Sequence, residues 1–266
     1  MKPRKLNDLE LMEQGVALGA RGVVIKTHFS PTAGRAALVN QIKKEKYPES
    51  EFELFGSVAL NRSMGGLNPY ALETELKMGA KVVWLPTVDS ENEFQKMGRS
   101  GGIRLVENGR AVPELMPIFE LIRDYDACLQ TGHVNAEECF PIVEAARNAG
   151  VQKIVVTHPD YHIVGMTLTQ QKQIVRDYGV YLEREYAQPV GNRFVCNLPS
   201  NVEAIQAIGA DYIILATDSG QVNTPFWKDA VRESIDYYRN AGISESDLRA
   251  MLVTNPGKML GLDFVK

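Results

Sequence analysis

The sequence predicts one α/β domain of the (β/α)8 TIM-barrel type over residues 1–266, with seven of the eight strands visible. Short apolar runs alternate along the chain with longer amphipathic segments that carry helix start and stop signals. The runs are rich in Val, Ile and Leu without polar alternation, which is typical of parallel strands buried on both faces. The length suits a single barrel, since such domains commonly have about 250 residues.

The elements are expected to follow one another as a first helix and then seven strand–helix units. Strands are expected near residues 22–28, 52–60, 81–87, 127–132, 153–158, 179–185 and 212–217. Helices are expected at 8–19, 34–46, 69–79, 113–125, 135–149, 167–178, 201–208, 226–241 and 245–260, the last with a break at Asn255-Pro256.

Helix boundaries are marked by capping residues. Asn68 followed by Pro69 predicts a helix start, because asparagine accepts from free N–H groups and proline suits the first helical position. The segments 200–203 and 244–247 have the form of capping boxes. Helix ends are expected at Gly79, Gly150 and Gly179.

The strand count is one short of a complete barrel, so the missing first strand is expected to precede Met1. An open doubly wound sheet would accommodate seven strands, but no glycine-rich dinucleotide fingerprint follows any of them. An incomplete barrel exposes two strand edges. We expect these edges to be covered either by the N-terminal segment or by a second copy of the chain in a homo-oligomer.

The longest irregular stretch, residues 88–112, follows the third visible strand. In a barrel it would lie on the catalytic face, where it could act as a lid. The alternative is a surface excursion with a small hairpin, in which residues 103–105 pair with 111–112 across Asn108-Gly109.

The bulk properties exclude several classes of protein. The net charge of −4 and the lack of a dense Lys/Arg tract argue against nucleic-acid binding. No apolar run approaches the roughly 20 residues of a membrane span. Three cysteines without a CxxC pair indicate a reduced, cytoplasmic protein rather than one with a disulfide framework. We expect its partner to be a small-molecule substrate.

Metal-capable side chains follow four of the apolar runs. These residues are His28, His133, His158 and Asp218. Because the active site of a parallel barrel lies at the carboxyl ends of its strands, we expect the four side chains to face one pocket. Neutral imidazole and carboxylate are ligands for Zn²⁺ or another divalent transition metal, which makes hydroxide available near neutral pH. The alternative for each histidine is a satisfied core or loop residue, and for Asp218 it is a helix cap.

Further candidates lie beside these residues. Lys26 shares the strand face of His28, so it is a candidate catalytic or binding residue if that face points inward. The alternative is that Lys26 turns outward between the helices. Asn61 and Arg62 close one strand and are candidates for binding an anionic substrate group. Glu183 and Tyr186 lie on opposite faces of another strand, and both are candidates for binding substrate. Because side chains alternate along a strand, either Glu183 and Glu185 or Arg184 and Tyr186 point into the barrel. For these second-tier residues a solvated surface position is the alternative.

The order of these motifs resembles that of the amidohydrolase superfamily. The segments 24–32, 60–68 and 156–159 and the ending 254–262 look like a family of TIM-barrel, metal-dependent hydrolase-like proteins, and the resemblance covers essentially the whole chain. It implies that His133 and His158 are the metal ligands of the fifth and sixth strands. It also implies that Asp218 is the eighth-strand aspartate, both ligand and proton shuttle.

The resemblance is incomplete at one position. The superfamily carries a His-x-His pair at the end of its first strand, and this sequence contains no His-x-His. We therefore expect either a start upstream of Met1 or a site that lacks these ligands, with His28 as a substitute.

The leading hypothesis is a metal-dependent hydrolase acting on a C–N or C–O bond, or a decarboxylase. One alternative is a non-catalytic barrel that binds a small ligand or partner, and another is a Schiff-base lyase that uses Lys26.

Overall fold

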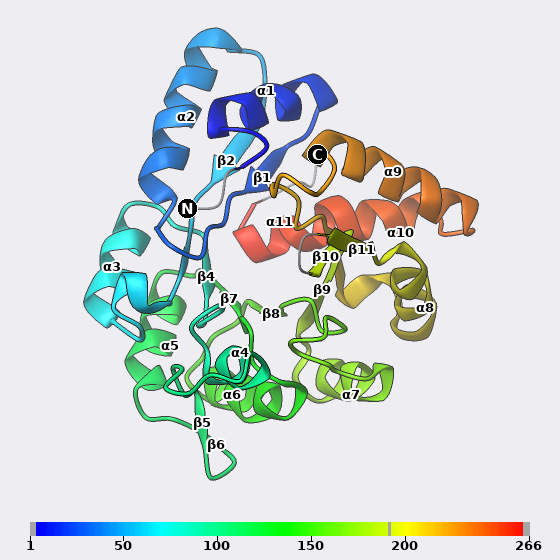
Figure 1. The fold of residues 1–266 in the computed structure, drawn as a ribbon. Coiled ribbons are helices and arrows are strands. Elements are labelled where there is room, and N and C mark those ends of the chain that lie inside the picture. The colour runs from blue at the N-terminus through cyan, green and yellow to red at the C-terminus, as the bar shows by residue number, and fades with distance from the viewer. Residues whose placement is uncertain (1–3, 191–192, 263–266) are drawn as a thin grey trace.

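The computed structural model describes residues 4–190 and 193–262, whose strands form a curved wall with helices packed around its outside (Figure 1). Six strands form one parallel sheet in the order β12-β9-β8-β7-β4-β3. These strands are β3 (Ser57–Ala59), β4 (Val82–Trp84), β7 (Cys128–Gln130), β8 (Ile154–Val156), β9 (Tyr181–Glu185) and β12 (Ile213–Ala216). Strands adjacent in this order follow one another along the chain, as in a barrel wall.

The wall continues beyond β3 through two further strands. The predicted strand 52–60 is divided at Gly56 into β2 (Glu53–Phe55) and β3, and β2 pairs in parallel with β1 (Gly22–Val24). A Cβ atom at Gly56 would lie 2.4 Å from Ala33 Cα, so glycine is needed where the strand bends against the next helix. The fold class is confirmed as a barrel-like parallel α/β fold, in which the described residues show no pairing between β1 and β12.

The predicted helices are present, with ends that differ by a few residues. They are α1 (Asp8–Leu18), α2 (Ala33–Lys46), α3 (Pro69–Lys77), α5 (Leu115–Asp124), α6 (Ala136–Asn148), α7 (Leu168–Tyr178), α8 (Leu198–Ile208) and α9 (Trp227–Asn240). The Asn68 side chain caps α3 as predicted. The prediction at 200–203 was wrong, because α8 begins at Leu198, with Pro199 in its first turn and no side-chain cap.

The final predicted helix breaks where proline interrupts it. Ser244 caps α10 (Glu245–Arg249), a π-helical turn (Ala250–Thr254) follows, and α11 (Asn255–Leu260) begins beside Pro256. Pro256 has no N–H to donate to the preceding turn, which accounts for the change in helix geometry.

Two features were missed or misplaced by sequence reasoning. Residues 88–112 contain a short helix, α4 (Glu91–Lys96), before the hairpin of β5 (Val106–Glu107) and β6 (Arg110–Ala111). The hairpin turn at Asn108-Gly109 was predicted, but the pairing starts later than residue 103. An unpredicted antiparallel pair, β10 (Ala187–Val190) with β11 (Arg193–Cys196), follows β9.

The strand residues divide between an inner and an outer core. Inward-facing apolar side chains of the wall, among them Val82, Trp84 and Cys128, pack with Met259 of α11. Their neighbours Val83 and Leu129 belong to the larger cluster between the strands and the helices. This alternation follows from the two-residue period of a strand, and α11 closes the apolar end of the interior.

The N-terminal segment lies beside the opening between β12 and β1. The Lys5 N–H donates to the Gly220 carbonyl at 3.0 Å, and Arg4 bridges to Gln221 in the loop after β12. The helix α1 contacts α2 and α9 on either side of the opening. This segment therefore covers an edge that the strand count had left exposed. No helix in the described part of the chain is long and apolar enough to cross a bilayer.

A buried arginine joins the loop after β8 to the helix layer. The Arg184 side chain is 1% exposed and donates to Asp160 at 3.0 Å, Gln171 at 3.1 Å and Asn201 at 3.0 Å. Arg184 thus holds the segment that follows His158 against α7 and α8.

Replacing Arg184 with methionine is expected to lower the free energy of unfolding by about 3–5 kcal/mol, because it leaves the buried polar partners unpaired. The matched control Arg176→Met breaks the exposed pair with Asp177 on α7 and should leave the unfolding midpoint nearly unchanged, because solvent screens this pair. Urea unfolding measures both. Equal midpoints for the two variants would contradict the structural role of Arg184.

Candidate active site

Three histidines from three strand ends lie next to one another. His28 follows β1, His133 follows β7 and His158 follows β8. The ring centroids are 5.7 Å apart for His28 and His133, and 5.0 Å apart for His133 and His158. Lys26 acts electrostatically both on His158 and on Asp218, which follows β12. The parallel wall therefore brings the three predicted strand-end histidines together, with Lys26 close to them.

The backbone turns sharply at these strand ends. Gly132, before His133, has φ +71°, and a Cβ there would lie 2.5 Å from the Leu85 carbonyl oxygen. His158 and Asp218 themselves have φ values of +26° and +46°. Non-glycine residues rarely adopt this left-handed region, and such strain concentrates at functional sites.

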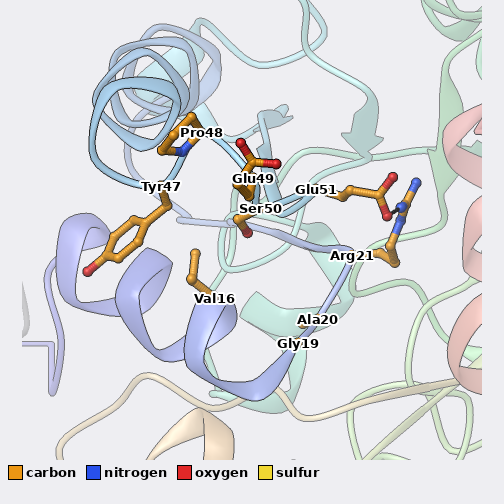
Figure 2. A pocket seen from close by; sticks show the side chains of 9 residues that line it. All are labelled: Val16, Gly19, Ala20, Arg21, Tyr47, Pro48, Glu49, Ser50 and Glu51. Carbon is orange, nitrogen blue, oxygen red and sulfur yellow. Dashed lines mark ion pairs between the residues drawn. The ribbon is translucent and has the colours of Figure 1, made fainter.

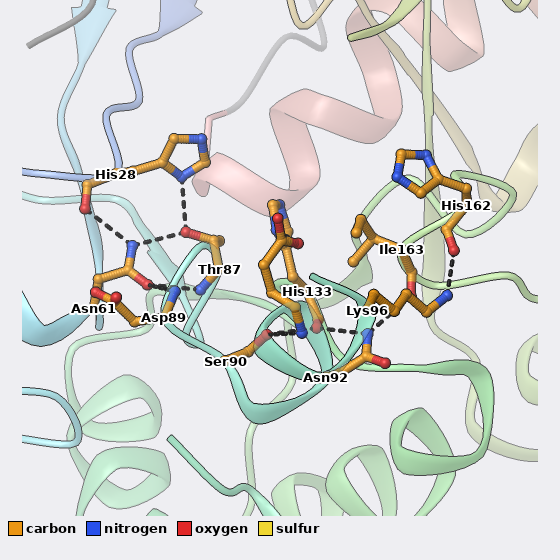
Figure 3. A network of polar contacts seen from close by, with 11 residues as sticks. His28, Asn61, Thr87, Asp89, Ser90, Asn92, Lys96, His133, His162 and Ile163 are labelled. Atoms are coloured by element: carbon orange, nitrogen blue, oxygen red, sulfur yellow. Dashed lines mark hydrogen bonds and ion pairs between the residues drawn. The ribbon is translucent and has the colours of Figure 1, made fainter. Parts of the chain in front are cut away.

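His133 is held by one turn of α4 (Figure 3). The Ser90 hydroxyl and the Asn92 amide donate to the His133 carbonyl at 2.9 Å and 3.1 Å. The Glu93 carboxylate pairs with the His133 Nδ1 at 3.0 Å. These contacts make residues 90–93 part of the wall of the site. They favour neither of the two expectations for residues 88–112, a mobile lid or a surface excursion.

His28 is held by a second network, from β3 and β4 (Figure 3). Its Nδ1 is 2.7 Å from the Thr87 hydroxyl, and the buried Asn61 amide donates to the His28 carbonyl at 3.0 Å and to Thr87 at 2.7 Å. Asn61 was expected to bind substrate, but its side chain is occupied with positioning His28. Arg62 is exposed, donates to the Gly101 carbonyl and lies over the Phe94 ring at 5.2 Å, so the structure does not bring it into the histidine group.

The two faces of β9 separate clearly. Glu183 accepts from Gln130 of β7 at 3.0 Å, which places it inside the wall with Glu185. Tyr186 points the other way and donates to Glu233 of α9 at 2.7 Å. The expectation that Tyr186 binds substrate is therefore not supported. Glu183 lies on the inner face, and its role in binding substrate stays a prediction.

Burial keeps the histidines neutral. It lowers the pKa of His28 to about 2, with help from the charge of Lys26, and lowers the pKa of His133 and His158 well below the usual range. A neutral imidazole has a free lone pair, so each ring is in the form that binds a metal ion.

The carboxyl groups of the site show the opposite shift. Burial raises the pKa of Glu183, Glu185 and Asp218, while the nearby Lys26 charge lowers all three. The Lys26 ammonium lies 5.1 Å from the Trp84 ring centroid. Lys26 thus faces the interior and is the counter-charge to a group of acids.

Several buried polar atoms near the strand ends have no hydrogen-bond partner among the described residues. They are His158 Nδ1, Glu185 Oε2, Ser219 Oγ and Gln221 Oε1. Unsatisfied buried groups are uncommon and call for a ligand, ion or water. The donor types and the orphaned His158 nitrogen fit a divalent metal. In residues 4–190 and 193–262, however, no group of three or more His, Cys, Asp and Glu side chains is arranged to hold an ion as it stands.

A surface hollow of about 540 Å³ lies elsewhere, between the end of α1 and the loop that precedes β2 (Figure 2). Its lining includes the ion pair of Arg21 with Glu51 and otherwise mostly small or apolar groups. It lies at the start of β1 and β2, opposite the strand ends where the histidines gather, and is not a candidate active site.

Solved structures with this fold include several hydrolases. An amidohydrolase from Pseudomonas aeruginosa aligns at a TM-score of 0.68 and 13% identity, over 96% of this chain and 92% of that one. A metallo peptidase from Rhodobacter sphaeroides, liganded with a phosphinate mimic of L-Ala-D-Ala, has a TM-score of 0.58, 14% identity and coverages of 95% and 71%. An organophosphorus hydrolase from Deinococcus radiodurans has a TM-score of 0.63, 14% identity and coverages of 95% and 82%.

The chain therefore shares its fold with an amidohydrolase, a metallo peptidase and an organophosphorus hydrolase. The chain belongs to DUF6282, a family of unknown function, whose model matches residues 1–183. No curated protein matches the sequence.

The buried neutral His158 makes stability depend on pH. Its pKa is lowered on folding, so the unfolded chain takes up a proton near pH 6.5 that the folded chain does not. Its contribution is complete above about pH 6.5 and declines below it, by up to about 1.4 kcal/mol per pH unit.

In metal-free protein, His158→Asn should therefore reduce the loss of stability between about pH 7.5 and about pH 5.5, as measured by urea unfolding. Asparagine tolerates the left-handed backbone at this position. The acids of the site titrate in both proteins, so the comparison isolates the histidine. Identical slopes would show that His158 is not buried in its neutral form.

Proposed function

We propose that the chain is a metal-dependent hydrolase that acts on a C–N or C–O bond of a small molecule, or the related decarboxylase. The observation that carries this proposal is the group of neutral imidazoles at the strand ends, with a buried His158 nitrogen that has no partner among the described residues. The three free cysteines and the net charge of −4 favour a cytoplasmic enzyme without a nucleic-acid partner.

His133, His158 and Asp218 would hold a Zn²⁺ or similar divalent ion, with His28 as a further ligand. When bound, the ion would supply Lewis-acid polarisation of the substrate and a water of lowered pKa.

The residues of the chain have distinct tasks in this proposal. Asp218, whose pKa is raised by burial, accepts a proton from the attacking water and returns it to the leaving group. Lys26 stabilises negative charge that develops on the substrate, since it faces the same interior. Glu93 and Thr87 keep the His133 and His28 rings in one orientation, so no reorganisation is needed when substrate binds.

A second candidate is a non-catalytic barrel that binds a small ligand. The observation in its favour is that no set of three metal-capable side chains within residues 4–190 and 193–262 is arranged around one point. Metal content separates the two candidates.

Purified chain is expected to retain about one equivalent of divalent transition metal, measured by inductively coupled plasma mass spectrometry. Chelation should abolish hydrolysis of a panel of amides, esters and lactones, and added Zn²⁺ should restore it. His133→Asn and His158→Asn should each reduce metal content. A metal-free protein with unchanged activity after chelation would exclude the proposed function.

Glu93→Gln is expected to weaken Zn²⁺ affinity by about 10–100-fold, because the carboxylate that orients the His133 ring is lost. Competition with a fluorescent chelator measures the affinity without any substrate. The control Glu91→Gln removes a carboxylate of the same helix that pairs with Arg104 at the surface. Equal affinity in both variants would mean that Glu93 does not position a metal ligand.

A further inference from the structure

Arg4 lies at the opening between β1 and β12, beside two residues of the proposed site. Its backbone bridges to Gln221, in the loop that contains Asp218. Its guanidinium crosses the opening and donates to the Lys26 carbonyl, two residues before His28, at 3.3 Å. The N-terminal segment therefore brings a cation to the rim of the site.

The Arg4 guanidinium is exposed and uses little of its hydrogen-bonding capacity. A guanidinium has five N–H donors, and its one hydrogen bond within the described chain is the contact with Lys26. No described carboxylate forms an ion pair with it, since none lies within 4.0 Å. Most of its donors are therefore available to a ligand.

The neighbouring Lys5 is different, because its side chain fastens the segment. Its ammonium donates to the Thr224 carbonyl at 2.5 Å and lies 4.8 Å from the Phe226 ring centroid. Together with the Lys5 N–H bond to Gly220, these contacts hold the segment to the loop after β12. The Arg4 side chain is not needed for that attachment.

The loop also leaves room for the arginine. A Cβ atom at Gly220, where φ is +135°, would lie 2.9 Å from Arg4 Nη1. Another residue at position 220 would be strained at this φ, and its Cβ would displace the flexible end of the Arg4 side chain. Glycine thus lets the cation lie directly against the backbone of the loop.

The charge of Arg4 reaches the site, although Arg4 forms no ion pair with a described carboxylate. After burial and Lys26, Arg4 is the next influence on the pKa of Asp218, which it lowers; it also lowers the pKa of His28. Lys26, by contrast, already faces Glu183, Glu185 and Asp218. Of the two cations, Arg4 is the one free to attract an anion.

We propose that Arg4 binds an oxyanion group of the substrate, a carboxylate or a phosphate, at the rim of the site. The planar fork of a guanidinium matches both groups, which it can bind through two parallel N–H···O bonds. This inference rests on the proposed function, because it assumes that the reacting group of the substrate lies at the histidines while its oxyanion group binds Arg4.

The test is calorimetric titration of the whole chain with inorganic phosphate and with succinate, in metal-free and Zn²⁺-loaded form. We expect at least one anion to bind without metal, and Arg4→Gln to weaken its affinity by about tenfold or more. Arg4→Lys should restore part of the loss. The preferred anion identifies the group as phosphate or carboxylate.

The control Lys5→Gln loosens the same segment but keeps the guanidinium. We expect this control to lower the melting temperature and to reduce the anion affinity less than Arg4→Gln does. Absence of anion binding, unchanged affinity in Arg4→Gln, or equal losses of affinity in the two variants would each overturn the proposal.

Failure of this inference differs from failure of the proposed function. Arg4-dependent anion binding by a chain that hydrolyses nothing would support the inference and exclude the hydrolase. Hydrolysis of an anionic substrate and its neutral analogue with equal kcat/KM, unchanged in Arg4→Gln, would support the hydrolase and exclude the role of Arg4.

Discussion

The structure depends on the two-residue alternation of short parallel strands that all run in the same direction. One face of each strand packs on the surrounding helices, and the other lines a narrow interior. Near the start of the strands that interior is apolar and closed by Met259. Toward their ends it becomes polar, with Gln130 and Glu183 joined at 3.0 Å. The same geometry therefore builds both the inner core and the floor of the site.

A second constraint is that the candidate ligands stand on turns after the strands, with left-handed backbone at His158 and Asp218, and need support from elsewhere. Segment 90–93 fixes both the backbone and the ring of His133, and Asn61 with Thr87 does the same for His28. His158 differs, because its Nδ1 has no partner in the described chain. The site thus combines two histidines whose rings are fixed by hydrogen bonds with one, His158, whose Nδ1 is free to bind a ligand.

The charges of the site are arranged by depth. Three acids with raised pKa values surround Lys26 in the interior, where burial disfavours their ionised forms. Arg4 lies at the rim, where solvent and an incoming anion can reach it. A substrate would thus meet an exposed cation first and neutral imidazoles and acids deeper in the barrel, an order that suits capture before reaction.

The sequence by itself determined the fold class and the positions of His28, His133, His158 and Asp218 along it, because apolar runs ending in polar residues reflect purely local patterns. Only the tertiary structure decided which face of β9 points inward. From the sequence alone, Glu183 and Tyr186 were equally good candidates for the interior. It also decided that Glu93 and Arg4 belong to the site and that Asn61 supports it. Those roles depend on contacts between residues far apart in the chain, such as His133 with Glu93, and no spacing or composition encodes such a contact.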